Sequence, residues 1–230
     1  MPDKKPDNEN YYSCNLKSDK LYQVYQTQIN RVKQYLNEEI SFIRNELQGN
    51  EKVLELGAGY GRIMKELAPY IRLIVGIDNS QDTVEFGKKY LKNISNCELL
   101  FMDAHAVRMD RKFDVVICLQ NGISAIKGDP LNLVNQGMKM LSPGGKAYFS
   151  SYSSDFWEDR LAWFQEQSDK GLLGKIDFAK TKKGIIVCQD GFIATTFSQE
   201  DMERLGQSVG YRYRVQEVDN SSIFLIIKKE

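Results

Sequence analysis

The sequence predicts an α/β fold in which helices cover both faces of a seven-stranded, mostly parallel sheet. Strand-like and helix-like segments alternate from residue 52 to residue 152. The strand-like segments are apolar on both faces, which is typical of a parallel sheet covered by helices. Two further strand-like runs at the end of the chain are joined by too few residues for a crossover helix, so they must pair antiparallel. The last strand is therefore expected to run against the others.

Helical periodicity marks the first part of the chain. Apolar residues recur at three- and four-residue steps from 21 to 47, which indicates one long amphipathic helix or two helices in sequence. Gly49 and Asn50 end this pattern. Residues 1–19 are mostly polar and carry prolines, so we expect a flexible tail, followed by a helical lid over residues 20–48.

The alternating segments that follow supply five strands and three helices. The run "SPGG" (142–145) is predicted to turn the chain into the fifth strand, and Ser80 is predicted to cap the second helix. The strands are expected at 52–56, 72–78, 97–102, 113–119 and 146–152, and the helices at 61–68, 81–91 and 131–141.

Residues 152–197 fit no strand–helix–strand unit. An aromatic-rich segment predicts a helix at 156–167, and the dipeptide Asp190-Gly191 predicts a hairpin between two short strands. We interpret this stretch as an insertion that covers one edge of the functional site, within a single domain of residues 20–230.

The chain ends in a helix and two strands. Ser198 and Asp201 have the spacing of a capping box, which predicts a helix at 199–208. The two strand-like runs at 211–219 and 222–229 complete the sheet of seven.

The charge balance, the cysteines and the lengths of the apolar runs argue against several classes of function. The 31 basic and 31 acidic side chains cancel, so the global positive field of a nucleic-acid binder is missing. Four cysteines stand far apart without nearby histidines, which favours neither a zinc site nor a disulfide scaffold. No run reaches the roughly eighteen apolar residues of a membrane span. We expect a cytoplasmic monomer or homodimer with no metal, and neither nucleic acid nor membrane as a partner.

The turn after the first strand carries the strongest functional signal. In "VLELGAGYGR" (53–62), Glu55 precedes Gly57, Gly59 and Gly61. Glycine permits positive φ and lets a ligand approach the backbone, and ligands of open α/β sheets bind at the carboxyl ends of the strands. The dinucleotide spacing G-x-G-x-x-G differs from this one, and a carboxylate before the first glycine would repel a pyrophosphate. A ligand that carries an ammonium group fits better.

Five ordered motifs resemble the class I S-adenosylmethionine-dependent methyltransferases, a family with a Rossmann-like sheet and a reversed last strand. The resemblance covers the chain from about residue 20 onward, and motif matches gain weight from such ordered context. It implies S-adenosylmethionine as the cofactor. The motifs are "VLELGAGYG" (53–61), "VGIDNS" (75–80), "FMDA" (101–104), "FDVVICLQNG" (113–122) and "LSPGGKAYF" (141–149).

The resemblance also implies roles for individual residues. Asp78 would accept hydrogen bonds from both ribose hydroxyls, and Asp103 would lie near the adenine amino group. Arg62 would either neutralise the cofactor carboxylate or reach solvent. The full set expected to bind the cofactor is Tyr25, Glu55, Gly57, Ala58, Gly59, Gly61, Arg62, Asp78, Asn79, Ser80, Asp103, Ala104, Leu119 and Gln120.

The methyl acceptor is expected to be a small molecule that offers an N, O or S atom. Positioning the acceptor can contribute about 7–11 kcal/mol, so no protein nucleophile is required. The run C-L-x-N (118–121) resembles the acceptor-facing segment of glycine and sarcosine N-methyltransferases. Asn121 and the single histidine, His105, are therefore the catalytic candidates.

Aromatic side chains of the lid and the insertion can either contact the acceptor or form core, because aromatic faces bind cations and flat ligands and also dominate burial. The expected acceptor-site residues are Tyr12, Tyr22, Asn121, Tyr152 and Trp157.

Three alternatives stay open. The chain could methylate a protein side chain, or it could bind the cofactor without turnover, as a sensor or an assembly subunit. It could also be a nicotinamide oxidoreductase, although such an enzyme would need a second mononucleotide half or a catalytic domain.

Overall fold

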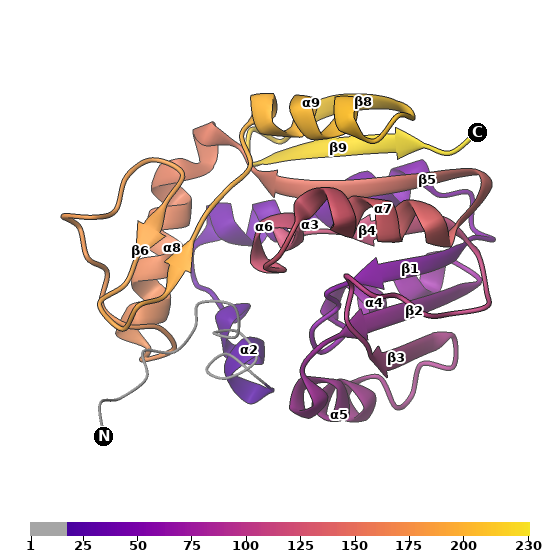
Figure 1. Ribbon diagram of the computed structural model, residues 1–230. Helices are drawn as coiled ribbons and strands as arrows, with labels where there is room; N and C mark the ends of the chain where they lie inside the picture. The colour runs from indigo at the N-terminus through magenta and orange to yellow at the C-terminus, as the bar shows by residue number, and fades with distance from the viewer. Residues whose placement is uncertain (1–17) are drawn as a thin grey trace, which may run out of the picture.

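Seven strands form one sheet across the middle of the computed structural model, which describes residues 18–230 (Figure 1). Their order is β3-β2-β1-β4-β5-β9-β8. Strand β9 is antiparallel to both of its neighbours, β5 and β8, and the remaining pairs are parallel. The predicted fold and its reversed last strand are confirmed. The strands are β1 (Lys52–Leu56), β2 (Leu73–Asp78), β3 (Cys97–Phe101), β4 (Phe113–Cys118), β5 (Leu141–Tyr152), β8 (Arg212–Val218) and β9 (Ser222–Lys228).

Helices cover both faces of this sheet, as the apolar strands require. Alternate residues of β1 enter different cores: Leu54 and Leu56 pack on one face, and Val53 packs on the other. The first face is covered by α6 (Gly122–Ala125), α7 (Pro130–Met140) and α9 (Gln199–Ser208), and the second by α3 (Asn30–Glu46), α4 (Arg62–Leu67) and α5 (Gln81–Tyr90).

The N-terminal helical pattern forms two helices, one of the two predicted arrangements. Five residues separate helix α2 (Asp19–Val24) from the start of α3. In the gap, the Thr27 hydroxyl donates to Glu166 Oε2 at 2.6 Å, and the Gln28 N–H donates to Glu166 Oε1 at 3.0 Å. These bonds hold the chain in a non-helical path.

Helix α2 begins at Asp19, the last residue of the range predicted as a tail. The tail's residues 1–17, with the predicted acceptor-site residue Tyr12, lie outside the described residues.

Strand β5 begins earlier than predicted. Leu141 already pairs with Phe113, and the register shifts before Lys146 pairs with Val115. The glycine-containing run at 142–145 is therefore an irregularity within β5 and not a turn that precedes it. A Cβ on Gly145 would lie 2.8 Å from the Asp114 carbonyl oxygen, so the backbones approach closely here.

Residues 153–197 leave the sheet and pack against α2 and α3 (Figure 1). The predicted helix and hairpin are present as α8 (Trp157–Asp169), β6 (Ile186–Val187) and β7 (Ile193–Ala194). Two short 3-10 helices, η2 (Ala68–Tyr70) and η3 (Ser154–Phe156), complete the described elements. The predicted caps are confirmed too: Ser80 caps α5, and Ser198 with Asp201 forms the capping box of α9.

Candidate functional site

A cavity of about 420 Å³ lies at the carboxyl ends of the parallel strands. Its floor is the glycine turn after β1 together with the residues that follow β2, β3 and β4, and its cover comes from α2 and α8. Within α8, Trp163 fixes part of this cover, because its indole N–H donates to the Val24 carbonyl oxygen at 3.1 Å. The cavity therefore lies where open α/β sheets bind their ligands.

The glycine turn has left-handed backbone at all three of its glycines. Gly57 and Gly59 line the cavity, with φ of 72° and 54°. Gly61, which was expected to bind the cofactor, has φ of 84° and is not among the lining residues. A Cβ at Gly61 would lie 2.6 Å from Leu91 Cδ1, so this glycine serves the close packing of the turn against the end of α5.

Glu55 faces the cavity from the end of β1 with only 3% of its surface exposed. Burial raises the pKa of its carboxyl to about 8; the nearby Arg62 guanidinium opposes this rise and Asp78 adds to it. Among residues 18–230, Oε2 of Glu55 has no hydrogen-bond partner. A buried oxygen of this kind is costly unless a ligand satisfies it.

Arg62 lines the same part of the cavity. Its guanidinium carbon lies 4.7 Å from the centre of the Tyr25 ring, which is a cation–π contact. Its Nε and Nη2 atoms are buried, and the described part of the chain offers them no acceptor. The cavity thus presents an unsatisfied carboxylate oxygen and unsatisfied guanidinium N–H groups together.

Asp78 ends β2 and supports the glycine turn. Its Oδ2 accepts from the Gly59 N–H at 3.0 Å, and its Oδ1 accepts from the Ser80 N–H at 2.9 Å. Burial raises the pKa of this carboxyl, and the two N–H donors oppose the rise. Because a carboxylate can accept about four hydrogen bonds, lone pairs remain for ligand hydroxyls.

Asp103 and His105 line the end of the cavity next to β3. Asp103 Oδ1 accepts from the His105 backbone N–H at 2.8 Å. His105 Nε2 lies 2.9 Å from the Lys127 carbonyl oxygen, and its Nδ1 lies 3.2 Å from Asn132 Nδ2. A ring protonated at Nε2 satisfies both contacts. Since both ring nitrogens are engaged, the geometry does not favour His105 as a general base.

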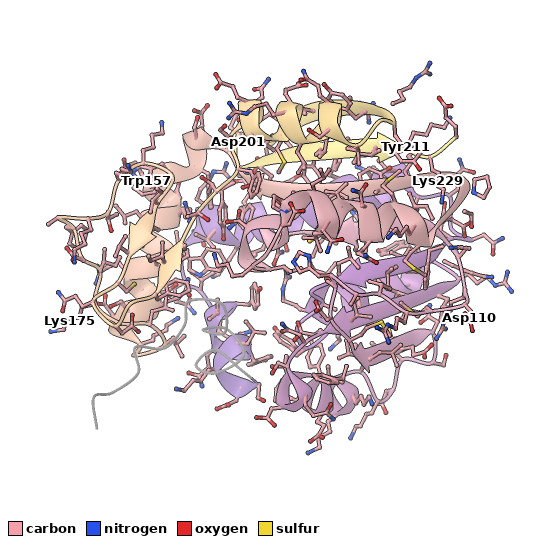
Figure 2. All side chains as sticks on the ribbon, viewed as in Figure 1. Asp110, Trp157, Lys175, Asp201, Tyr211 and Lys229 are labelled. Atoms are coloured by element: carbon pink, nitrogen blue, oxygen red, sulfur yellow. The ribbon has the colours of Figure 1, made fainter. Side chains whose placement is uncertain are left out.

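The predicted acceptor-site residues do not all reach the cavity. Tyr152 lines it. Tyr22 is absent from the lining and packs in an aromatic cluster with Tyr60, 5.7 Å between ring centres. Trp157 is also absent and lies at the start of α8, where Figure 2 labels it.

Asn121 is buried, with 6% of its surface exposed, and it is not a lining residue. Its amide nitrogen donates to the Thr195 carbonyl oxygen at 3.0 Å, and its amide oxygen accepts from the Ser151 hydroxyl at 2.8 Å. The side chain therefore joins the loop after β4 to β5 and to the segment after β7.

The remaining residues expected to bind the cofactor do line the cavity. They are Tyr25, Ala58, Asn79, Ser80, Ala104, Leu119 and Gln120.

Other lining residues were not predicted as site residues. One group comes from the loop and short helix after β4, and the spacing of another, 163, 164 and 167, indicates one face of α8. Such periodicity could have signalled a buried face, but not that this face meets a cavity. The unpredicted lining residues are Leu21, Val24, Tyr60, Ile63, Ile77, Thr83, Met102, Gly122, Ala125, Ile126, Lys127, Gly128, Trp163, Phe164 and Gln167.

The described residues contain neither a membrane-spanning helix nor a cluster of metal ligands. No helix within residues 18–230 is long and apolar enough to cross a membrane. In the same part of the chain, no group of three or more His, Cys, Asp or Glu side chains is arranged to hold a metal ion.

Comparison with known proteins gives a family match in the part of the chain that builds the turn. Residues 53–145 match the family model described as a methyltransferase domain. Ubiquinone biosynthesis O-methyltransferase from Hydrogenovibrio crunogenus is 24% identical over 129 residues, which are 55% of this chain and 53% of that protein. The chain thus matches about half the length of such curated relatives.

Solved structures extend the similarity in fold to nearly the whole chain. A protein from Pyrococcus horikoshii OT3 is 23% identical with a TM-score of 0.63, covering 96% of this chain and 99% of that one. The N-methyltransferase NodS from Bradyrhizobium japonicum WM9, solved with S-adenosyl-L-homocysteine, is 14% identical with a TM-score of 0.59 and coverage of 96% and 98%. These findings agree with the predicted resemblance: residues 53–145 have the sequence of a methyltransferase domain, and nearly the whole chain has a fold similar to that of a solved methyltransferase.

Proposed function

We propose that this protein transfers a methyl group from S-adenosylmethionine to an N, O or S atom of a small molecule. The observation that carries the proposal is the pairing of unsatisfied groups beside the glycine turn. Glu55 offers a buried carboxylate oxygen, and Arg62 offers buried N–H groups, in one cavity. An amino-acid moiety, with its ammonium and its carboxylate, would satisfy both.

The rest of the cavity fits the nucleoside part of the same cofactor. Asp78 would accept from the ribose hydroxyls while it keeps its bonds to the Gly59 and Ser80 N–H groups. Asp103 keeps one carboxylate oxygen beyond its bond to the His105 backbone, and that oxygen would accept from the adenine amino group. Gly59 would let the ligand lie against bare backbone.

When bound, S-adenosylmethionine would supply a methyl group activated by its positively charged sulfur, and transfer of this methyl to an acceptor lone pair would leave the sulfur as a neutral thioether. The protein then has to hold the acceptor in line and keep water out. Positioning of this kind is worth about 7–11 kcal/mol. Tyr152 at the end of β5, with Tyr25 and Trp163 at the cover, would provide that enclosure.

A small acceptor is favoured because α2 and α8 cover the cavity. We therefore also propose that residues 20–48 act as a lid and that residues 152–197 bound the acceptor side. The names of the curated relatives, ubiquinone biosynthesis O-methyltransferases, support a small-molecule acceptor. The equal numbers of acidic and basic residues support the absence of a nucleic-acid partner. Free thiols at Cys97, Cys118 and Cys188 support a reducing, cytoplasmic location, and we propose a monomer or a homodimer.

Calorimetric titration of the full chain tests the cofactor assignment. We expect S-adenosylmethionine and S-adenosylhomocysteine to bind at one site in the micromolar range, and Asp78→Ala to abolish that binding. The matched control is Asp110→Asn, because Asp110 is an exposed loop carboxylate outside the cavity lining (Figure 2). NADH binding without binding of either sulfur nucleoside would overturn the proposal in favour of an oxidoreductase.

Incubation with methyl-labelled cofactor and fractionated cell metabolites tests the transfer itself. The expected result is label in a small-molecule fraction. Label only in protein would indicate a protein acceptor, and cofactor binding with no labelled fraction would indicate a sensor or an assembly subunit. Either of these outcomes would contradict the small-molecule proposal.

A further inference from the structure

The loop that follows β4 contains two consecutive non-glycine residues with left-handed backbone. Gln120 has φ of 54° and Asn121 has φ of 62°. This conformation costs roughly 1–2 kcal/mol per residue, and it persists only where the surroundings hold it. Neighbouring residues must therefore hold this turn in its left-handed conformation.

The left-handed turn lies beside the glycine turn. Strands β1 and β4 pair in parallel, with Glu55 opposite Ile117, so the residues after β4 neighbour those after β1. Gln120 lines the cavity, and its amide nitrogen is buried without a partner in the described chain. The turn therefore borders the end of the cavity that holds Glu55 and Arg62.

The side chain of Glu39, in α3, hydrogen-bonds to this turn. It is completely buried, with 0% of its surface exposed. Its Oε2 accepts from the Gln120 backbone N–H at 2.7 Å, and its Oε1 accepts from the Ser222 hydroxyl at 2.6 Å. One carboxylate thus links the lid-side helix, the cavity wall and the start of β9.

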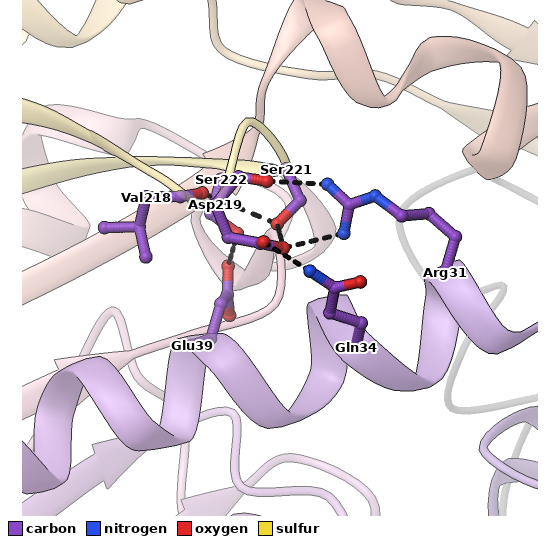
Figure 3. A network of polar contacts seen from close by, with 7 residues as sticks. All are labelled: Arg31, Gln34, Glu39, Val218, Asp219, Ser221 and Ser222. Atoms are coloured by element: carbon purple, nitrogen blue, oxygen red, sulfur yellow. Dashed lines mark hydrogen bonds and ion pairs between the residues drawn. The ribbon is translucent and has the colours of Figure 1, made fainter.

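Helix α3 is itself anchored next to Glu39, as Figure 3 shows. Arg31 donates to the Asp219 carboxylate and to its carbonyl oxygen, both at 2.6 Å. Gln34 donates to the other carboxylate oxygen of Asp219 at 2.7 Å. These bonds fix α3 on the turn between β8 and β9, so Glu39 meets Gln120 from a defined position.

We propose that Glu39 is a positioning residue, which holds the Gln120–Asn121 turn in its left-handed form and so shapes the end of the cavity that receives the amino-acid part of the cofactor. This inference rests on the proposed function. Stability alone accounts poorly for the residue, because an apolar side chain of similar size is often as stable as a buried charged group. A hydrogen bond to one specific N–H explains why a carboxylate stands there.

The test compares two ligands across variants of the full chain. S-adenosylhomocysteine carries the amino-acid part, whereas methylthioadenosine lacks it. In Glu39→Leu, we expect S-adenosylhomocysteine to bind at least about tenfold more weakly, because a buried N–H loses its acceptor and the turn is released. Methylthioadenosine should bind as it does to the wild type. Glu39→Gln should restore binding, since its amide oxygen can accept from Gln120 while its NH2 group donates to Ser222.

Two further variants separate local from general effects. Lys33→Gln changes an exposed side chain of the same helix and leaves Glu39 and its anchors in place, so it should bind both ligands as the wild type does. Glu39→Asp keeps the charge but shortens the side chain, so it should also weaken S-adenosylhomocysteine binding and leave methylthioadenosine binding unchanged. This variant replaces Glu39→Leu if Glu39→Leu does not fold.

Several results would overturn the inference. Unchanged S-adenosylhomocysteine binding in Glu39→Leu or Glu39→Asp would do so, and so would equal weakening of both ligands. Failure of Glu39→Gln to restore binding would also contradict it. If the wild type bound neither ligand, the proposed function would fail instead, so the two failures are distinguishable.

Discussion

Replacing Glu55 by Gln removes the ionisable carboxyl from the cavity and keeps the side-chain volume. In the ligand-free protein this carboxyl is buried, 3% exposed, with one oxygen lacking a partner. If it meets the ammonium of the cofactor, losing a charge-assisted hydrogen bond costs about 1.5–3 kcal/mol. We therefore expect S-adenosylmethionine to bind about 10- to 150-fold more weakly to Glu55→Gln.

The same substitution weakens ligand binding but should stabilise the fold relative to wild type as pH rises. The pKa of Glu55 is raised from 4.5 to about 8 by burial, so between these values the folded chain holds a proton that the unfolded chain has released. Wild-type stability therefore falls with rising pH, by about 1.4 kcal/mol per unit at most. From about pH 5 to about pH 8, the stability of Glu55→Gln relative to wild type should rise by about 3 kcal/mol.

Two assays check these expectations. Calorimetry at neutral pH, repeated in buffers of different ionisation enthalpy, should show release of a proton when wild type binds S-adenosylmethionine, and loss of that release in Glu55→Gln. Methylthioadenosine, without the ammonium, should bind both proteins equally. Urea unfolding across the pH range measures the stability difference.

Equal cofactor affinity of Glu55→Gln and wild type would refute the reasoning, and so would a stability difference that stays constant with pH. The first result would mean that the carboxylate faces no cation, and the second that its pKa is not raised.

Three other substitutions test the packing around the site. Gly61→Ala should lose about 1–3 kcal/mol of unfolding free energy, because its φ of 84° and the Leu91 side chain 2.6 Å from the new Cβ leave no room; unchanged urea unfolding would contradict this. Asn121→Ala should lose about 1–2 kcal/mol in the same assay, since both ends of its buried amide are hydrogen-bonded. Thr27→Val should raise amide exchange in α2 about tenfold by removing the 2.6 Å bond to Glu166; unchanged exchange would show that this bond does not hold the cover.

Most of the fold was predictable because it depends on short-range patterns. Unbroken apolar runs predicted the parallel strands, and a capping box and a hairpin dipeptide predicted α9 and the β6–β7 pair. The start of β5 was not predictable. It depends on pairing between Leu141 and Phe113, and the local glycines suggested a turn instead.

The cavity lining at the strand ends was also largely predictable, because its residues directly follow strands whose carboxyl ends meet at one edge. The lining near the proposed acceptor side was not predictable. Asn121 looked like a site residue from its local motif, but its amide bonds Thr195, which lies 74 residues away in the chain. Glu39 was missed for the same reason: its contact with Gln120 spans 81 residues in the chain, so no local sequence pattern indicates it.

A structure of the protein soaked with S-adenosylhomocysteine tests the central claim most directly. The account predicts the ribose hydroxyls at the Asp78 carboxylate and the amino-acid moiety between Glu55 and Arg62, with the adenine toward Asp103. A cavity that stays empty at saturating ligand, or a nucleoside bound with its amino-acid end away from Glu55, would contradict it.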